Sequence, residues 1–552
     1  MRVLLISPIF PKTFWSFEGV LKLVGRKALI PPLGLATVAA LLPQDWQFRL
    51  IDRNVDALGE ADWAWADLVM LSGMIVQKDD MLSLIAEAGR RDKAIVVGGP
   101  YVTSVPDEAI AAGADYMVLD EGELTIPPFV DEILAHGVRR RETGAPARIF
   151  RAKDAKPDMT TTPVARFDLF NLDAYDAMAI QYSRGCPFLC EFCDIITLYG
   201  RRPRAKTPEQ VLAELQRLYD LGWRRGIFLV DDNFIGNKRN VKVLLEHLEV
   251  WQRERNYPFW FDTEASIDLA ADPELLAAMV RCHFASVFIG IETPDSESLE
   301  LTRKHQNNRR SMEESIALIT RAGLRVMCGM ILGFDNERRG AGDRILRFVE
   351  TTAVPTVILS MLQALPNTGL WDRLAREGRL HDTTANINQT TALNFVPTRP
   401  VGEITDEFIA SFRALYEPLP YLRRVYRHIM ELGEDTPPQP KTSSSHKDPL
   451  PWSHRVRRGL VENAYILRAF AIVCWRQGVV RETRGAFWRQ MVSVARRKPQ
   501  YFTLYLALCA QNEHFLEYRD LVTREIQAQV LDRREEVFVK PVIEPHTSVS
   551  AA

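Results

Sequence analysis

Apolar and polar positions alternate in short blocks along residues 1–135. Apolar runs such as VLLISPI and AIVVGG are separated by amphipathic stretches such as MLSLIAEAGRR. Such runs are typical of buried parallel strands, and the amphipathic stretches of the helices that cover them. The pattern predicts an open parallel sheet, with a ligand-binding edge at the carboxyl ends of its strands. The turns at that edge contain Ser72, Gly73, Gly98, Gly99, Glu121 and Gly122.

A second strand–helix series occupies residues 178–400. Six apolar runs, from AIQYSRG to TVILSMLQAL, alternate with helical patterns such as PEQVLAELQRLYDLG. Six units of this kind predict a partial or complete parallel barrel, whose active site lies at the carboxyl ends of the strands. Residues 136–177 separate the two series and show no clear period, so we predict a linker there.

Strand signals fade after residue 400. Helical patterns dominate residues 401–535, apart from a Pro- and Ser-rich segment at residues 436–451 that is predicted to be flexible. The last residues, 536–552, are predicted to be disordered. The whole chain is therefore predicted to consist of two α/β domains followed by a mostly α-helical domain.

Composition and charge narrow the class of protein. The 552 residues suggest three or four domains, and 47% hydrophobic with 25% charged residues is ordinary for a globular chain. A formal net charge of −2 provides no basic field, so a nucleic-acid partner is not expected. The first residues lack the features of a signal peptide, and no apolar stretch is long enough to span a bilayer. A cytoplasmic protein is predicted.

Three of the seven cysteines are clustered, in SRGCPFLCEFCD. Cys186, Cys190 and Cys193 follow the first strand of the second series, and three thiolates at this spacing can hold three irons of a [4Fe–4S] cluster with the fourth iron open. A structural zinc site would need a fourth ligand, and no partner motif lies nearby. A redox-active CxxC pair is the other alternative, but it leaves Cys186 unexplained.

The cluster motif resembles that of the radical S-adenosylmethionine (SAM) superfamily, in which an aromatic residue precedes the last cysteine. The resemblance implies that the three cysteines bind a [4Fe–4S] cluster and that Phe192 contacts the adenine of SAM. It also implies SAM contacts from later strand ends, where capping, salt-bridge or packing roles are the alternatives. These residues are Asp231, Asp232 and Asn233 in LVDDNFIGN, Glu264, Glu292, and Gly329 and Gly333 in GMILGF.

The N-terminal region resembles the B12-binding domain of cobalamin-dependent radical SAM enzymes, through PPLGLATVAALL, VVGGPYVT and DEGE. The resemblance implies a Rossmann-like cobalamin-binding sheet before a (β/α)6 partial TIM barrel, the radical SAM core. The turns named above would then contact cobalamin. The segment IDRNVDALG contains no histidine, so cobalt would lack a protein imidazole ligand. An empty sheet is the alternative.

The helical region resembles the accessory domain of a bacterial subgroup of these enzymes, some of which methylate hopanoid lipids. The implied function is radical C-methylation of an unactivated carbon, with a hopanoid-type lipid methylated at C2 as the best substrate. No acid–base dyad is expected, so no catalytic residue is assigned. A radical SAM enzyme with non-methylating chemistry, and a non-catalytic cobalamin sensor, remain alternatives.

The expected partners are a small-molecule or lipid substrate and an electron donor such as flavodoxin or ferredoxin. The helical region also contains many aromatic residues, which would line an apolar pocket, form a peripheral contact with the inner membrane, or belong to a plain helical core. They are Tyr465, Phe470, Trp475, Phe487, Trp488, Tyr501, Phe502 and Tyr505.

Overall fold

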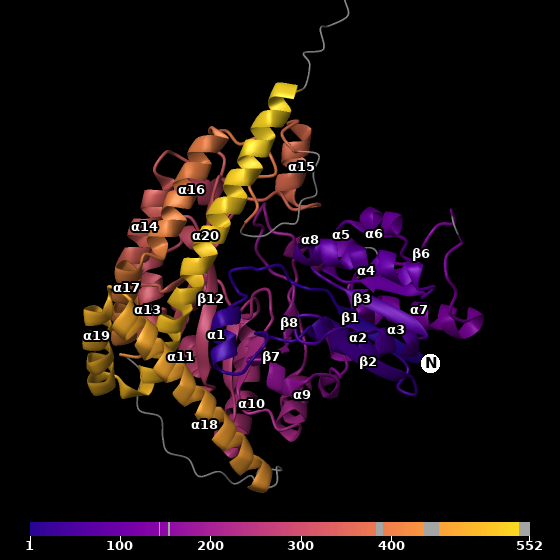
Figure 1. Ribbon diagram of the computed structural model, residues 1–552, viewed down its shortest axis with the longest axis horizontal. Helices are drawn as coiled ribbons and strands as arrows, with labels where there is room; N and C mark the ends of the chain where they lie inside the picture. Colours follow the sequence, from indigo (N-terminus) through magenta and orange to yellow (C-terminus); the bar gives the residue numbers. More distant parts are fainter. Residues whose placement is uncertain (143, 153–154, 382–389, 435–451, 540–552) are drawn as a thin grey trace, which may run out of the picture.

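A parallel six-stranded sheet forms the N-terminal domain (Figure 1). The structure is a computed structural model and describes residues 1–142, 144–152, 155–381, 390–434 and 452–539. Both faces of the sheet are covered, since alternate residues of β1 belong to two separate apolar clusters. The strands, in spatial order, are β2 (Gln47–Asp52), β1 (Arg2–Ser7), β3 (Leu68–Ser72), β4 (Ile95–Gly98), β5 (Tyr116–Val118) and β6 (Arg148–Phe150).

Two sets of helices supply these clusters. Helices α2 (Leu33–Leu41) and α7 (Gly122–His136) pack on one face of the sheet. The opposite face is covered by a second set, which consists of α3 (Glu60–Trp65), α4 (Lys78–Arg90), α5 (Pro100–Ser104) and α6 (Pro106–Ala112). The predicted α/β sheet with helices on both faces is confirmed.

Residues 136–177, which we expected to be a linker, contain the sixth strand. β6 pairs in parallel with β5, with Tyr116 opposite Arg148 and Val118 opposite Phe150. The strand is short, lies at the edge of the sheet and leaves Ile149 exposed, so it lacks the apolar run that identifies a buried strand.

The central domain is built on a second sheet of six parallel strands. β7 and β14 form its edges and do not pair with each other among the described residues, so the barrel is partial, as predicted. The strands, in spatial order, are β14 (Thr356–Met361), β13 (Arg325–Leu332), β12 (Phe284–Glu292), β11 (Trp260–Glu264), β10 (Gly226–Leu229) and β7 (Ala177–Ile180). Helices that alternate with these strands are α9 (Pro208–Asp220), α10 (Lys238–Glu254), α11 (Pro273–Arg281), α13 (Met312–Ala322) and α14 (Ala341–Thr352).

Helices dominate the C-terminal part, as predicted. The chain ends in α16 (Val401–Leu415), α17 (Pro418–Glu431), α18 (Trp452–Trp475), α19 (Arg484–Arg497) and the long α20 (Phe502–Val539). The helix α20 continues four residues beyond the predicted start of the disordered tail, and the predicted flexible segment and the rest of the tail lie outside the described residues. No helix in the described ranges is both long and apolar enough to cross a membrane.

The segment after β1 ties the first domain to the other two. Phe14 stacks on Phe515 of α20 at 4.8 Å between ring centroids, and Trp15 lies edge-on to Phe288 of β12 at 6.0 Å. His514 of α20 contacts the Phe14 carbonyl at 3.0 Å. One apolar cluster therefore extends from the N-terminal sheet through the barrel to the C-terminal helices.

Candidate functional site

The loop with the three clustered cysteines begins directly after the first barrel strand. A short antiparallel pair, β8 (Ser183–Arg184) and β9 (Arg204–Ala205), frames it. Gly185 has a φ of +94°, and a Cβ there would lie 2.8 Å from the Gly200 carbonyl, so glycine is required at this turn. The Cys186 amide donates to the same carbonyl at 3.3 Å. The backbone thus fixes the start of the loop at the carboxyl end of β7.

The three thiols have surroundings that fit a metal cluster. Burial raises the pKa of the Cys186 and Cys193 thiols, and neighbouring cysteine sulfurs raise both further. Because a thiol must lose its proton to bind iron, cluster binding would release protons from these groups. The Gln306 side chain donates to Cys190 Sγ at 3.7 Å. This set of donors matches a cluster that takes one thiolate on each of three irons.

A site for one ion is a poorer fit. Among the described residues, no three His, Cys, Asp or Glu side chains converge closely enough to hold a single metal ion. A structural zinc needs four ligands around one point, whereas the corners of a cubane hold their thiolates apart. The cysteine loop therefore favours the cluster over structural zinc.

The carboxylates after β10 hold the cysteine loop in place. Asp231 accepts from the amides of Tyr182 and Ser183 at 2.8 and 2.7 Å, and from the Ser183 hydroxyl at 2.6 Å. Asp232 accepts from the Gly185 amide at 2.9 Å. Burial raises the pKa of Asp231 to about 7 and that of Asp232 to about 6. Asp231 is fully occupied by these contacts, whereas Asp232 retains a free oxygen.

Asn233 is also engaged by protein groups. Its side chain exchanges hydrogen bonds with Ser266, whose amide donates to Asn233 Oδ1 at 3.2 Å. A hydrogen bond from Asn233 to the Cys186 thiol partly offsets the burial that raises the pKa of that thiol. The Asn233 side chain is therefore largely engaged by Ser266.

Glu264 and Glu292 end neighbouring strands but differ in their partners. The carboxylate of Glu264 has no hydrogen bond or ion pair with any described residue, and burial raises its pKa to about 8, with Asp232, Asp231 and Glu292 adding to the shift. Glu292 forms a buried ion pair with Lys304. Since Glu264 is an unpaired acid among other acids, it is the strand-end carboxylate best suited to accept a cation.

Phe192 and Gly329 border the same region of the barrel mouth. The Phe192 ring lies 6.0 Å from the Phe334 ring, and Lys304 Nζ lies 5.9 Å from its centroid. A Cβ at Gly329 would lie 3.1 Å from Phe288 and 3.9 Å from a Glu292 oxygen. The Phe288 ring therefore already fills the space that a Cβ at Gly329 would need, so packing within the protein accounts for this glycine. Gly333 packs against Leu393, and its φ of +101° likewise explains the glycine without a ligand.

Contacts within the protein explain the glycines that were predicted to contact a ligand at the edge of the N-terminal sheet. A Cβ at Gly98 would lie 2.8 Å from the Val118 carbonyl. Gly99 has a φ of +93°, and a Cβ there would lie 2.4 Å from Ser72 Oγ and 3.2 Å from the Gly73 backbone. Ser72, Gly73, Gly98 and Gly99 therefore lie together at one edge of the sheet, as predicted, but the close packing of their own backbone already requires the two later glycines.

The third predicted turn of this sheet makes contacts across the domain boundary. Glu121 accepts from Arg184 at 2.8 Å and from Arg204 at 2.7 Å, and Glu123 accepts from Arg184 at 2.9 Å. Gly122 begins α7 and has ordinary packing contacts. Glu121 is thus committed to two arginines that flank the cysteine loop. Arg204 therefore has a partner within the protein.

The same edge of the N-terminal sheet exposes apolar side chains that fit a large ring ligand. Ile9 and Phe10 follow β1 and are 41% and 42% exposed, and Met74 follows β3 and is 54% exposed. No histidine occurs in the loops after β1 to β5. Asp52, at the end of β2, accepts from Asn54 and from Tyr175 at 2.9 Å. The edge thus offers apolar contact area to a corrin but no imidazole to its metal.

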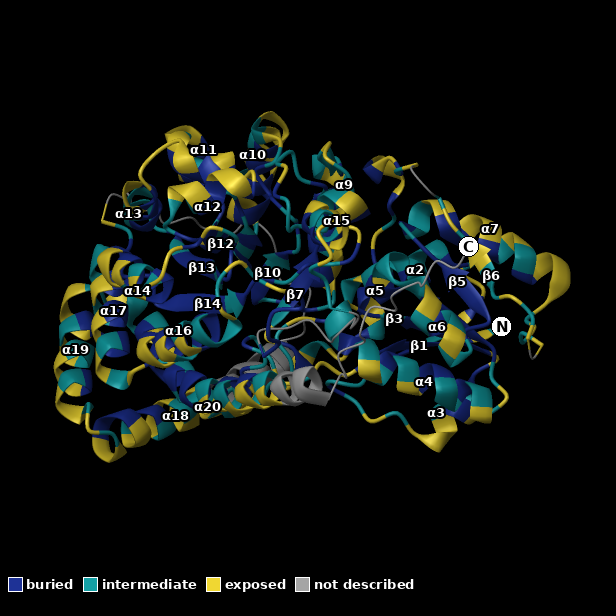
Figure 2. Ribbon diagram, turned by 90° about the horizontal axis from the view of Figure 1, so that it is seen from above, coloured by how far each residue is buried: buried dark blue, intermediate teal, exposed yellow. Residues whose placement is uncertain are grey.

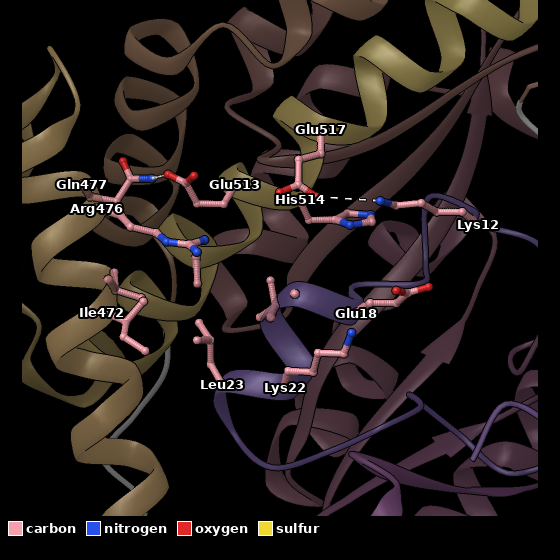
Figure 3. Close-up of a pocket in the computed structure, with 14 residues that line it drawn as sticks. Lys12, Glu18, Lys22, Leu23, Ile472, Arg476, Gln477, Glu513, His514 and Glu517 are labelled. Atoms are coloured by element: carbon pink, nitrogen blue, oxygen red, sulfur yellow. Dashed lines mark hydrogen bonds and ion pairs between the residues drawn. The ribbon is translucent and has the colours of Figure 1, made fainter. Parts of the chain in front are cut away.

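A partly open cavity of about 170 Å³ lies elsewhere, between α1 (Glu18–Leu23), the end of α18 and α20 (Figure 3). Its lining is charged. Lys12 pairs with Glu517 at 3.7 Å, and Gln477 donates to Glu513 at 2.7 Å. This volume is below the usual range for small-molecule sites, and the cavity contains none of the predicted site residues. The aromatic pocket that the C-terminal sequence allowed is therefore not this cavity.

Sequence reasoning missed two polar side chains of the site. Lys304 and Gln306 belong to the polar stretch RKHQNN, which carries no motif. Glu292, the partner of Lys304, lies 12 residues earlier in the chain, and Cys190, the partner of Gln306, lies 116 residues earlier. Burial works to lower the pKa of Lys304, but Glu292 and the nearby cysteine sulfurs outweigh it, and the pKa rises. The only available signal was a lysine in the segment that follows a strand-end carboxylate.

A parallel sheet with an apolar ligand edge, followed by a partial barrel with a three-cysteine loop, is the arrangement that the resemblance to cobalamin-dependent radical SAM enzymes implies. Three family models match the chain. They are the B12 binding domain at residues 23–130, the Radical SAM superfamily at residues 180–349, and the Domain of unknown function (DUF4070) at residues 368–528. The predicted cofactors, a [4Fe–4S] cluster, SAM and cobalamin, are confirmed by these matches.

Similar proteins narrow the class further. The chain is 55% identical to an uncharacterized methyltransferase of Synechocystis, over 100% of this chain and 98% of the relative. It is 34% identical to the hopanoid C-2 methylase of Rhodopseudomonas palustris, over 88% of each chain. The chain therefore belongs to the family of cobalamin-dependent radical SAM methyltransferases.

Solved structures share the fold. TsrM from Kitasatospora setae, a radical SAM methyltransferase solved with cobalamin and a [4Fe–4S] cluster, matches with a TM-score of 0.58 at 15% identity, over 84% of this chain and 99% of that chain. The cobalamin-dependent enzyme OxsB, solved with aqua-cobalamin and SAM, matches with a TM-score of 0.57 at 14% identity, over 98% of this chain and 80% of that chain.

Proposed function

We propose that this enzyme methylates an unactivated carbon of a hopanoid-type lipid, at C2. The observation that carries the proposal is the 34% identity to the hopanoid C-2 methylase, which extends over 88% of each chain. The hopanoid C-3 methylase of Methylococcus capsulatus is 24% identical over 70% of this chain. Methylation at C2 is thus favoured over C3.

Cys186, Cys190 and Cys193 are the proposed ligands of the cluster, which when bound supplies the electron for reductive cleavage of SAM. Glu264 accepts the ammonium group of SAM, because its carboxylate is unpaired and surrounded by other acids. Phe192 and Gly329, which border the same region of the barrel mouth, are the proposed contacts of the adenine. Asp231 and Asn233 position the cysteine loop instead of contacting SAM.

Cobalamin is proposed to rest against the exposed apolar side chains of the N-terminal edge. Ile9, Phe10 and Met74 provide contact area there. Ser72, Gly73, Gly98 and Gly99 shape the turn beside the cobalamin tail. Reduced flavodoxin or ferredoxin is the proposed electron donor. In this arrangement the protein holds its ligands in place and excludes water, while the cofactors supply the chemistry.

Expression in a hopanoid-producing bacterium that lacks its own C-2 methylase tests the substrate. Mass spectrometry of extracted lipids is expected to show 2-methylhopanoids with the wild-type chain and none with Cys186→Ala. A strain that produces soluble chain with a full cluster, yet contains only unmethylated hopanoids, would contradict the proposed substrate.

Assays with the purified enzyme distinguish methylation from the non-methylating alternative. Methyl transfer consumes one SAM as methyl donor and a second as radical source, so S-adenosylhomocysteine and 5′-deoxyadenosine should form in equal amounts with the methylated lipid. Formation of 5′-deoxyadenosine and a rearranged product without S-adenosylhomocysteine would favour the alternative.

A further inference from the structure

A large apolar face is exposed at the end of the C-terminal domain. Helix α19 lies at the end of the molecule farthest from the N-terminal sheet, and α18 runs from that end toward the middle of the molecule, where it contacts α1 (Figures 1 and 2). Leu467 is 68% exposed, Trp475 63% and Val480 61%. Large apolar side chains that are exposed together mark binding surfaces in soluble proteins. We define the α18–α19 surface by Leu467, Phe470, Trp475, Val480, Trp488 and Val492, all of which are exposed.

These side chains lie on two helices that meet at one turn. Leu467, Ala471 and Trp475 recur every four residues along α18, so they share one side of the helix. The π-helical turn Arg476–Val480 then connects α18 to α19. The Trp488 indole donates to the Gly478 carbonyl at 2.8 Å, which places Trp488 of α19 against that turn. Exposed apolar side chains therefore occur on both sides of the turn that joins α18 to α19.

The same segment is strongly basic. Residues 464–500 contain eight Arg or Lys and a single acidic residue, Glu482. Only Arg481 of these cations forms an ion pair within the described part of the chain, with Glu513. Six of the arginines are exposed around the apolar side chains, namely Arg468, Arg476, Arg484, Arg489, Arg496 and Arg497.

We propose that the α18–α19 surface docks on an anionic lipid bilayer. Interfacial helices bury Trp, Phe and Leu among the lipid chains and keep Arg at the level of the phosphate groups. This surface has both features, with two exposed tryptophans and an excess of positive charge. A second copy of the chain is a poorer occupant, because a symmetric contact would bring the same arginines together.

The docking surface goes beyond the proposed function. It rests on exposed side chains and charge, and it does not require that the substrate is a hopanoid. The two ideas make separate predictions, since one concerns vesicle binding and the other concerns the methylated product.

Sedimentation with lipid vesicles tests the surface. The full-length holoenzyme is mixed with sucrose-loaded vesicles, made either of phosphatidylcholine alone or of phosphatidylcholine and phosphatidylglycerol in equal parts. We expect binding to the anionic vesicles that weakens as salt is added, because exposed charges are screened. R484E/R489E should weaken this binding roughly tenfold or more, and L467S/W475S should weaken it several-fold.

Matched controls use exposed residues on other faces. Leu134 on α7 is 67% exposed, and Arg239 lies on the exposed side of α10. L134S and R239E should bind vesicles as the wild type does, and circular dichroism should show that all variants are folded. Equal binding of R484E/R489E and the wild type would overturn the proposal. So would a dimer in solution that L467S/W475S dissociates, with no binding to vesicles.

An activity assay with lipid dispersed in detergent distinguishes failure of the docking proposal from failure of the proposed function. If lipid dispersed in detergent is methylated but vesicles are not bound, the docking surface is wrong and the proposed function stands. If vesicles are bound as expected but no lipid is methylated, the docking surface stands and the substrate is wrong.

Discussion

Glu264 and Glu292 carry the same side chain at the ends of adjacent strands, yet their surroundings give them different chemistry. The strand pattern is sufficient to predict that both carboxylates lie at the carboxyl edge of the barrel. It does not predict that Lys304 neutralises Glu292 and leaves Glu264 unpaired. That difference depends on a contact between a strand and a later segment, which a single sequence does not reveal.

The pH dependence of stability should report the unpaired Glu264. Its folded-state pKa of about 8 lies above the value near 4.3 of an unfolded glutamate. Between these values the folded chain holds a proton that the unfolded chain has released, so stability falls as the pH rises. Urea unfolding of the apo-protein at pH 5 and pH 8 should show a smaller fall for Glu264→Gln, by on the order of 1–3 kcal/mol.

The control for this prediction is Glu246→Gln on the exposed side of α10, which should leave the fall unchanged. The same Glu264→Gln variant should bind SAM about tenfold more weakly, because a charge-assisted hydrogen bond is lost. Identical stability profiles for Glu264→Gln and the wild type would contradict the unpaired carboxylate.

The buried pair of Lys304 and Glu292 should behave as a unit. Lys304→Met leaves Glu292 buried without its cation and should cost about 3–5 kcal/mol of unfolding free energy. Adding Glu292→Gln to Lys304→Met removes the uncompensated charge and should recover most of that loss. Lys242→Met, which breaks exposed ion pairs with Asp272 and Glu274, should cost far less, because solvent screens these charges. Additive losses in the double variant would argue against the coupling.

At the scale of elements, the sequence was informative where strands are long, apolar and central. The six barrel strands and the first five strands of the N-terminal sheet follow from apolar runs between helices. The edge strand β6 and the two-residue pair β8 and β9 do not, because so few residues leave no pattern. Yet β8 and β9 frame the cysteine loop, so the elements nearest the chemistry were the hardest to predict.

The turn between β4 and α5 provides a prediction at this scale. At Gly99 an alanine meets both a left-handed φ and the Ser72 hydroxyl, and it should destabilise the fold by about 2–4 kcal/mol. Gly113 has a φ of +108° but open space around it, so Gly113→Ala should cost only about 1 kcal/mol. Denaturant unfolding of both variants measures the difference. Equal costs would mean that Ser72 moves aside freely.

The packing of this turn also limits what a glycine substitution can reveal about the position of cobalamin. A bulky residue at Gly98 or Gly99 would displace the protein's own backbone before it reached a ligand. Loss of methyl transfer in such a variant therefore does not by itself locate the cobalamin. Substitutions of the exposed Ile9, Phe10 and Met74 are better probes, because these side chains are at least 41% exposed.

For the whole molecule, the relative position of the two α/β domains depends on contacts between distant segments. Arg184 precedes Cys186 by two residues and pairs with both Glu121 and Glu123 of the other domain. Arg204, from the second strand of the small hairpin, also binds Glu121. The sequence identified Glu121 as a strand-end carboxylate, but its partners lie more than 60 residues away. The order of domains could be predicted from the sequence. The ion pairs of Arg184 and Arg204 with Glu121 and Glu123, which we call the interdomain clamp, could not.

The clamp should hold the cysteine loop and the N-terminal sheet in one arrangement. Arg184→Met leaves two acids at a buried boundary without their shared cation, a loss of about 3–5 kcal/mol. Because the loss falls on the interface between the domains, calorimetry is expected to show one unfolding transition for the wild type and two for Arg184→Met, with the same iron content in both. Arg184→Met combined with Glu121→Gln and Glu123→Gln should restore part of the single transition in which both domains unfold together.

The control is Arg217→Met, which removes a half-exposed partner of Asp168 and should leave the wild-type unfolding transition unaltered. One undivided transition in Arg184→Met, at the wild-type temperature, would show that the aromatic contacts of Phe14 and Trp15 suffice to join the domains.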